Sequence, residues 1–286
     1  MTISGTNVGL RRFSKLTCFA TLFLIFVGGM VTSTGSGLAV PDWPLSYGSL
    51  FPPMVGGVFY EHGHRIVAAL VGILTFFLTV WLSLAQEIRW VRRLGFCALG
   101  CVIAQGVVGG LTVLFFLPMV LSVYHAVLAQ TFFIFTLFIA YSQSSERESM
   151  QEQAKETAPA VLKLSLLLSL LVYVQLILGA LMRHTGCGLA IHLIQAVAIV
   201  VVAGQLSAAC IQSCREKSRV PTLILLDLLL MTQIVLGVLT VLIQKTAIVA
   251  SLHVVTGAAV LGVSVLMLLR LAPLTWKETG ELLFVR

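Results

Sequence analysis

The sequence predicts an all-α integral membrane protein whose eight transmembrane helices form two tandem four-helix bundles, related by a parallel, pseudo-twofold repeat. The 286-residue chain is 58% hydrophobic, with a mean hydropathy of +1.03. Only 10% of its residues are charged, whereas a soluble domain carries about 25%. Its apolar runs are each about 20 residues long, enough to cross a bilayer as a helix. Motifs of the first half recur in the second at fixed offsets.

The apolar runs give the expected helices in order. They are residues 14–33, 63–85, 94–114, 119–141, 160–182, 189–212, 220–242 and 247–270. The first run follows Arg11, Arg12 and Lys15, as the apolar part of a signal peptide does. No clear small-residue cleavage site follows it, and it continues into a motif-rich loop, so we expect it to remain as a helix.

The placement of basic residues predicts the orientation in the membrane. If the helices alternate in direction, nearly all lysines and arginines fall on one side, and only Arg65, Arg183 and Lys245 fall on the other. Cytoplasmic loops carry the excess of basic residues. We therefore expect a multi-pass protein of the inner (plasma) membrane with both termini in the cytoplasm. This bias accounts for the net charge of +7 without a nucleic-acid partner.

The cysteines do not indicate a disulfide framework. Five of the six lie within the expected helices or at their cytoplasmic ends, where thiols stay reduced. These are Cys18, Cys97, Cys101, Cys210 and Cys214. Buried free cysteine behaves as a small hydrophobic residue, so we expect these side chains to pack within the helices.

The chain divides into two halves. Residues 1–141 form the N-terminal half, with a long outer loop at 34–61; residues 142–159 form a polar cytoplasmic linker; and residues 160–286 form the C-terminal half. A loop this long is usually functional or disordered. Its aromatic residues, which include Trp43, Tyr47 and Phe51, favour packing at the membrane interface as a lid or belt.

The internal repeat has two offsets. The segment Gln105-x-x-x-Gly109-x-Leu-Thr-Val-Leu recurs 128 residues later from Gln233, whereas Thr-Gly-Ser-Gly-Leu-Ala from Thr34 recurs as Thr-Gly-Cys-Gly-Leu-Ala 151 residues later from Thr185. The second half therefore lacks a counterpart of the segment from Pro41 to Glu61. Both halves begin with a helix in the same direction, which makes the repeat parallel.

Four histidines follow this repeat. His192 lies 128 residues after His64, and His253 lies 128 residues after His125. All four are expected near the outer ends of helices. Facing histidines in a helical bundle can hold a cofactor, and imidazole suits iron. A flat porphyrin needs space, which Gly106, Gly109, Gly110 and Gly237 could provide by letting backbones approach. We hypothesise one haem per half, held by His64 with His125 and by His192 with His253.

A simpler interpretation is that these histidines form hydrogen bonds across helices. Four of them at one depth and one fixed offset make that less favoured, because ionisable residues in lipid are rarely kept without a use. Zinc is less favoured than haem, since it prefers three or four converging ligands. His62 and His184 have no repeat partners, and we expect them at the interface or at a haem edge.

Glu61 precedes His64 by three residues and would share its helix face. It is a candidate catalytic proton acceptor, or alternatively an acid that the helix dipole favours at a helix start. The outer basic residues Arg65, Arg183 and Lys245 are candidate partners of haem propionates, or alternatively interfacial anchors.

These motifs resemble those of the haem A synthase family. The resemblance is carried by Gly28-Gly29-x-Val-Thr-x-Thr-Gly-Ser-Gly-Leu-Ala39, Pro41-Asp-Trp-Pro-Leu45 and Glu61-x-x-His64-Arg65, with the eight helices and four histidines. It implies an enzyme that oxidises the C8 methyl group of haem O to a formyl group, giving haem A for cytochrome oxidase.

The resemblance also implies roles for individual residues. Glu61, His64 and His125 would form the substrate site, and His192 and His253 would ligate the iron of a haem b cofactor. Haem O synthase and a second copy of the chain are candidate partners, while the electron donor is not indicated. Many family members carry a cysteine pair in the first outer loop, where this chain has Val40 and Ser46. A thiol-based step in that loop is therefore not expected.

Three other functions were weighed. A non-enzymatic di-haem electron carrier of b type would need the histidines but not Glu61. A transporter would show broken helices at mid-membrane, which the sequence does not indicate. The prenyltransferase that makes haem O needs aspartate-rich motifs, whereas this chain has only Asp42 and Asp227.

Overall fold

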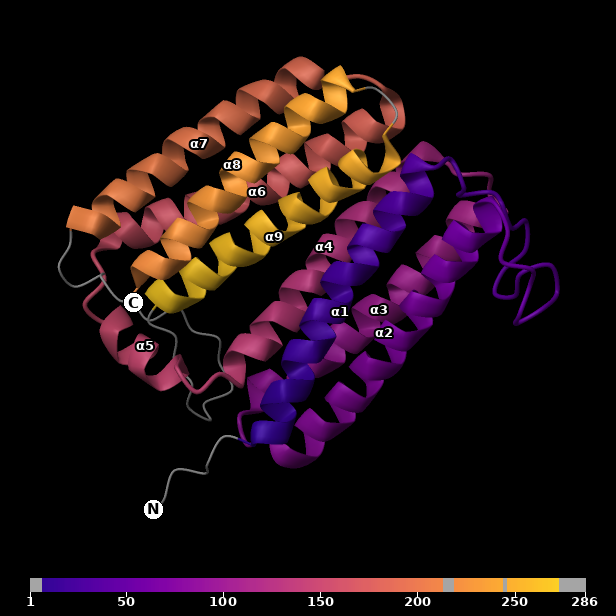
Figure 1. Cartoon of the computed structure of the whole chain (residues 1–286). Coiled ribbons are helices and arrows are strands. Elements are labelled where there is room, and N and C mark those ends of the chain that lie inside the picture. Colours follow the sequence, from indigo (N-terminus) through magenta and orange to yellow (C-terminus); the bar gives the residue numbers. More distant parts are fainter. Residues whose placement is uncertain (1–6, 213–218, 244–245, 273–286) are drawn as a thin grey trace.

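The computed structural model describes residues 7–212, 219–243 and 246–272. The helices in these ranges are α1 (Val8–Ser33), α2 (Gly57–Ala85), α3 (Arg89–Leu114), α4 (Met119–Ser142), α5 (Arg147–Ala154), α6 (Pro159–Thr185), α7 (Leu189–Gln212), α8 (Val220–Leu242) and α9 (Ala247–Leu271) (Figure 1). All except the short α5 are long and apolar enough to cross a membrane. The predicted class, an all-helical membrane protein with eight spans, is confirmed.

Several helices extend beyond the predicted apolar runs. Helix α1 begins at Val8 because the Asn7 side chain caps it, accepting a hydrogen bond from Leu10 N at 3.1 Å. Helix α2 begins at Gly57, directly after Gly56 with its φ of 55°. The outer loop therefore ends at Gly56, and its predicted end at Glu61 is wrong. Hydropathy marks the stretch within lipid, and a helix can continue past it. The short α5 within the linker was not predicted.

The helices pack as two neighbouring groups. Helices α1 to α4 contact one another in sequence and close through α1 on α4, while α6 packs against α7 and α9, and α8 against α9. The groups meet where α1 packs on α9 and α4 on α6, which Figure 1 shows as the dark and light helices lying side by side. Contact between α2 and α3 is extensive, but contact between α7 and α8 is slight. The tandem repeat itself stays a prediction.

Each group has its own apolar core. Leu78, Leu82 and Ile139 belong to the first core, and Leu206 and Leu261 to the second. Cys18 and Cys210 are buried free thiols, as expected of packing residues. Cys101 is partly buried and Cys97 is exposed, while Cys214 lies outside the described residues.

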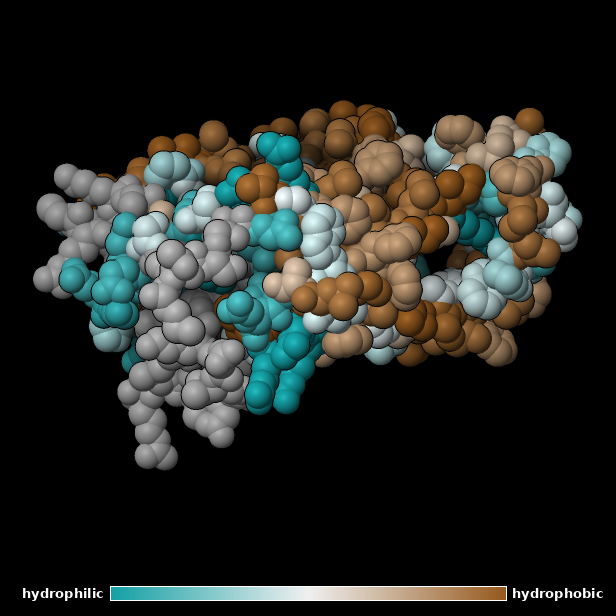
Figure 2. All heavy atoms as spheres, turned by 90° about the horizontal axis from the view of Figure 1, so that it is seen from below, coloured by the Kyte–Doolittle hydropathy of each residue, from teal (hydrophilic) through white to brown (hydrophobic). Residues whose placement is uncertain are grey.

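The linker is fastened to the second group at the end where α5 lies. Gln151 Nε2 donates to Leu269 O at 3.1 Å, and Arg270 pairs with Glu146. Arg219 is fully buried and donates through Nε to Arg270 O at 3.2 Å. Figure 2 shows hydrophilic side chains gathered over this end beside a broad hydrophobic surface.

Close packing between the groups gives a first prediction. A methyl group on Gly29 of α1 would lie 3.3 Å from Ser251 Cβ and 3.4 Å from Ser251 Cα on α9. Because overpacking of this kind costs about 1–3 kcal/mol, we expect Gly29→Leu to lower the thermal unfolding temperature in detergent. Gly100→Leu is the control, since a methyl group on Gly100 would meet nothing within 4 Å. Equal losses in both variants would contradict this packing.

Candidate functional site

The four repeat-related histidines lie at one end of the molecule. Each falls within the first eight residues of its helix, namely His64 on α2, His125 on α4, His192 on α7 and His253 on α9. These helices follow the connections 34–56, 115–118, 186–188 and 243–246, which all lie at the end away from α5. The predicted common depth therefore agrees with the helix bounds.

Each imidazole ring lies against a glycine of the preceding transmembrane helix. A methyl group on Gly28 would come within 3.1 Å of His64 Cε1, and one on Gly109 within 2.9 Å of His125 Cε1. In the second half the same distances are 3.3 Å from Gly179 to His192 and 3.1 Å from Gly237 to His253. Any larger residue would displace the ring, so the glycines fix where the rings lie. The fourth residue is named in the sequence only through this contact.

The glycine contacts repeat with the sequence offsets. Gly179 follows Gly28 by 151 residues, and Gly237 follows Gly109 by 128. Gly109 and Gly237 were predicted to let backbones approach, and here they accommodate imidazole rings. Gly106, predicted for the same purpose, would meet nothing within 4 Å if it carried a methyl group.

A glutamine four residues before the glycine contacts three of the histidines. Gln105 Nε2 donates to His125 O at 3.0 Å, and Gln175 Nε2 donates to His192 O at 2.9 Å. Gln233 Nε2 lies 3.4 Å from His253 Nε2. The equivalent residue on α1 is Leu24, so His64 lacks this contact.

Sequence reasoning missed Gln175, Gly179 and the role of Gly28. The signal was present, because Gln-x-x-x-Gly occurs on α3, α6 and α8, one turn from a histidine-bearing neighbour. The search compared the halves at offset 128 alone in this region, and Gln175 follows the other offset.

The rings do not make the cross-helix hydrogen bonds of the simpler interpretation through Nδ1. In all four histidines Nδ1 is buried without a hydrogen-bond partner. An imidazole nitrogen that donates to nothing can accept a proton or coordinate a metal. The rings are therefore placed by packing and keep unused nitrogen atoms, which suits metal ligation.

The second-half pair has the spacing that one shared metal ion requires. The ring centroids of His192 and His253 lie 6.5 Å apart, with an interplanar angle of 63°. A metal–imidazole bond of about 2 Å on each side places the ring centres roughly 6 Å apart. Among the described residues no three His, Cys, Asp or Glu side chains converge. A metal here would thus take two protein ligands, as the iron of a porphyrin does.

Glu61 is buried and hydrogen-bonded to the outer loop. It is 3% exposed, its Oε2 accepts from Val40 N at 2.8 Å, and its Oε1 pairs with Arg65 Nη2 at 2.6 Å. Because α2 begins four residues earlier, Glu61 does not lie in the first turn. The alternative of an acid stabilised at a helix start is therefore wrong, and Glu61 instead fastens the loop to α2.

Arg65 holds the same loop from the next turn of α2. Its Nη1 donates to the carbonyl oxygens of Asp42 and Leu45, each at 2.7 Å. His62 is also buried and shares a 2.8 Å hydrogen bond between its Nδ1 and Ser46 Oγ. The interfacial position expected for His62 is thus replaced by a place beneath the loop. Val40 and Ser46, which stand where relatives of the resemblance carry cysteines, are both fully buried.

The other predicted site residues lie apart from this network. Arg183 Nη2 donates to Gly29 O at 3.1 Å and to Ser33 Oγ at 2.5 Å, which joins α6 to α1. His184 is partly buried at the end of α6. Lys245 lies outside the described residues. The propionate-binding roles of Arg65, Arg183 and Lys245 stay predictions.

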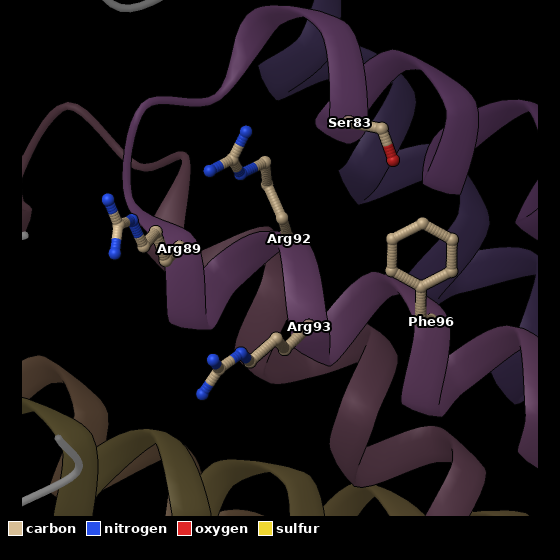
Figure 3. Close-up of a pocket in the computed structure, with 5 residues that line it drawn as sticks. All are labelled: Ser83, Arg89, Arg92, Arg93 and Phe96. Atoms are coloured by element: carbon tan, nitrogen blue, oxygen red, sulfur yellow. The ribbon is translucent and has the colours of Figure 1, made fainter. Parts of the chain in front are cut away.

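A basic pocket of about 300 Å³ lies at the opposite end of the first group. It is lined by Arg89, Arg92, Arg93 and Phe96 at the start of α3, with Ser83 of α2 (Figure 3). This is the arginine cluster that the charge pattern assigns to the cytoplasmic surface. Its distance along α2 and α3 from the histidines makes it an anchoring feature and not the candidate site.

The loop gives a pH prediction. Backbone N–H groups of Gly48 and Tyr47 donate to Asp42 and hold its pKa below the usual range, which is near 3.9. Its contribution to loop order is therefore complete above about pH 4 and is lost as the pH falls through the lowered pKa. We expect a nitroxide label at position 51, in a background without other cysteines, to stay equally immobile from pH 7 to 5 and to loosen below pH 4.

Asp42→Asn is the control for that measurement, because it should loosen the loop at every pH. Loosening between pH 7 and 5 would contradict the assignment and would point to His62 instead.

Comparison with known proteins adds to this geometry. The chain is 30% identical over 188 residues to the "Heme A synthase" of Symbiobacterium thermophilum, covering 63% of this chain and 61% of that protein. The protein of the same name from Exiguobacterium sibiricum is 31% identical over 186 residues, again covering 61% of its length. The one from Geobacillus kaustophilus is 26% identical over 302 residues, covering 92% of each chain. The first two matches thus span about three fifths of their relatives.

A family model matches a larger continuous part of the sequence. It is described as cytochrome oxidase assembly protein, COX15-CtaA, and it matches residues 11–56 and 54–196. These ranges include the outer loop, Glu61 and three of the four histidines. The chain belongs to the COX15-CtaA family of cytochrome oxidase assembly proteins.

Proposed function

We propose that this protein is a haem A synthase, which oxidises the C8 methyl group of haem O to a formyl group. The observation that carries the proposal is the set of four imidazole rings, each placed by a glycine. The relatives named "Heme A synthase" support the choice of reaction. The sites would face the outer side of the inner membrane, with both termini in the cytoplasm.

The two halves would hold different porphyrins. His64 and His125 bind the substrate haem O beneath the outer loop, and His192 and His253 ligate the iron of haem b. When bound, haem b supplies one-electron transfer. The glycines keep the rings in position, and Gln105 and Gln175 hold the backbone of two ligand residues.

Conversion of a methyl to a formyl group removes four electrons and four protons and adds one oxygen atom from water or dioxygen. Two successive oxidations give a gem-diol, which loses water to leave the aldehyde. Glu61 accepts a proton in this sequence. A carboxylate offers about four acceptor sites, and Val40 N and Arg65 Nη2 use two of them, so capacity remains for a substrate proton.

Replacing the acid tests its part in the chemistry. General-base catalysis contributes about 10²–10⁴-fold, so we expect Glu61→Gln to reduce haem A formation by that order while haem content is retained. The measurement is chromatography of extracted haems after expression with a haem O source. Arg65→Gln is the matched control, because it breaks the same ion pair but keeps the acid.

Full conversion by Glu61→Gln, or an equal loss in Arg65→Gln, would contradict the proton-acceptor role. In the second case the pair would matter only for holding the loop. A di-haem electron carrier, the rival function, predicts no haem A and no hydroxylated haem O in any extract.

The glycine contacts give a separate prediction about haem content. Gly237→Val would push the His253 ring from its place, since even a methyl group would lie 3.1 Å from Cε1. We expect loss of the second-half haem, measured as haem per chain by the pyridine haemochrome spectrum. Gly204→Val on α7 is the control, because a methyl group there would meet nothing within 4 Å. An unchanged haem content in Gly237→Val would show that this contact does not set the ligand.

A further inference from the structure

Trp43 of the outer loop lies against α3 beside the contact that places His125. A methyl group on Gly110 would lie 2.5 Å from Trp43 Cδ2 and 2.6 Å from Cε2, closer than real contacts allow. The neighbouring residue, Gly109, faces His125 in the same way. Two consecutive glycines of α3 thus accommodate a proposed haem ligand and an indole ring from the loop.

The loop segment around Trp43 is held from α2 as well. Arg65 Nη1 donates to the carbonyl oxygens of Asp42 and Leu45, which flank the Trp43-Pro44 step. Glu61 holds Val40 N just upstream. The indole is therefore placed between the outer ends of two helices, α2 and α3. Trp43 is nevertheless 40% exposed, so part of its ring is free to contact a ligand.

The second half has the histidines but not this arrangement. The residue equivalent to Gly110, 128 positions later, is Val238, which is 51% exposed. Its α6–α7 connection consists of residues 186–188, too short to carry a counterpart of Trp43. The paired glycine and the indole therefore occur only in the half assigned to the substrate. Nothing about holding a ring of histidine requires Gly110.

We propose that Trp43 is a positioning residue that closes the outer end of the first-half site between α2 and α3 and slows release of the tetrapyrrole held there. This inference rests on the proposed function, because it requires a porphyrin at His64 and His125. Flat aromatic surface suits the edge of a tetrapyrrole and its hydrocarbon substituents. A wall carried by a loop can open for a substrate that enters and leaves, whereas a wall carried by a helix cannot.

The test measures release of haem b, used as the probe, from the full-length protein in nanodiscs. Release is followed by absorbance after mixing with excess haem-scavenging apoprotein. His64→Ala identifies the phase that belongs to the first half. We expect Trp43→Ala and Gly110→Ala each to speed that phase by about tenfold or more, since changes in affinity act mainly through dissociation rates. The other phase should not change.

Two further variants separate positioning from a general loss of structure. Trp43→Phe should restore slow release in part, because a flat ring is retained. The double variant Trp43→Ala/Gly110→Ala should match Trp43→Ala alone, because the added methyl group no longer meets an indole. Val238→Ala, the matched change in the second half, should leave the His64-dependent phase unchanged.

Each failure has its own meaning. A His64-dependent phase that is unaffected by Trp43→Ala and Gly110→Ala overturns the role of Trp43 and leaves the proposed function intact. Additive effects in the double variant also overturn it, because Gly110→Ala would then act without the indole. The absence of any His64-dependent phase overturns both the proposed function and this inference.

Discussion

An imidazole ring can lie against a neighbouring helix only where that helix has no side chain, and this constraint shapes the whole outer end of the molecule. Gly28, Gly109, Gly179 and Gly237 meet it. Each glycine and its histidine come from helices that pack closely together, such as α1 with α2 and α8 with α9. Helix packing and ligand placement are therefore one feature. The bundle cannot shift these helices without moving the rings.

The two halves differ in what surrounds the rings. In the first half the outer loop is fastened to α2 through Glu61, His62 and Arg65, and its Trp43 lies on α3. In the second half α7 and α8 make little contact and the connection above them is short. One duplicated arrangement of ligands thus has a cover and a buried acid on one side only. That asymmetry suits a substrate in one half and a cofactor in the other.

The sequence was sufficient for the membrane class, the eight spans and the four histidines, because hydropathy and a fixed offset are properties of the chain alone. Helix starts were less accessible, since caps such as Asn7 and the turn at Gly56 lie beyond the apolar stretch.

The surroundings of the site could not be predicted, for a physical reason. The loop is held mainly through backbone groups, such as Val40 N and Asp42 O, which every sequence has. Gly109 was identified, but as a place for close helix approach, because spacing does not tell which neighbour faces a glycine. Gln175 could have been found by searching for Gln-x-x-x-Gly at both offsets.

The central claim is that paired histidines share one iron, and low-temperature electron paramagnetic resonance of the oxidised, haem-loaded protein tests it most directly. Two imidazole ligands predict a low-spin ferric signal. His253→Ala should convert the second-half signal to high spin, because one ligand is lost. A high-spin spectrum of the unaltered protein, or a low-spin signal that survives removal of both His192 and His253 and of both His64 and His125, would contradict the account.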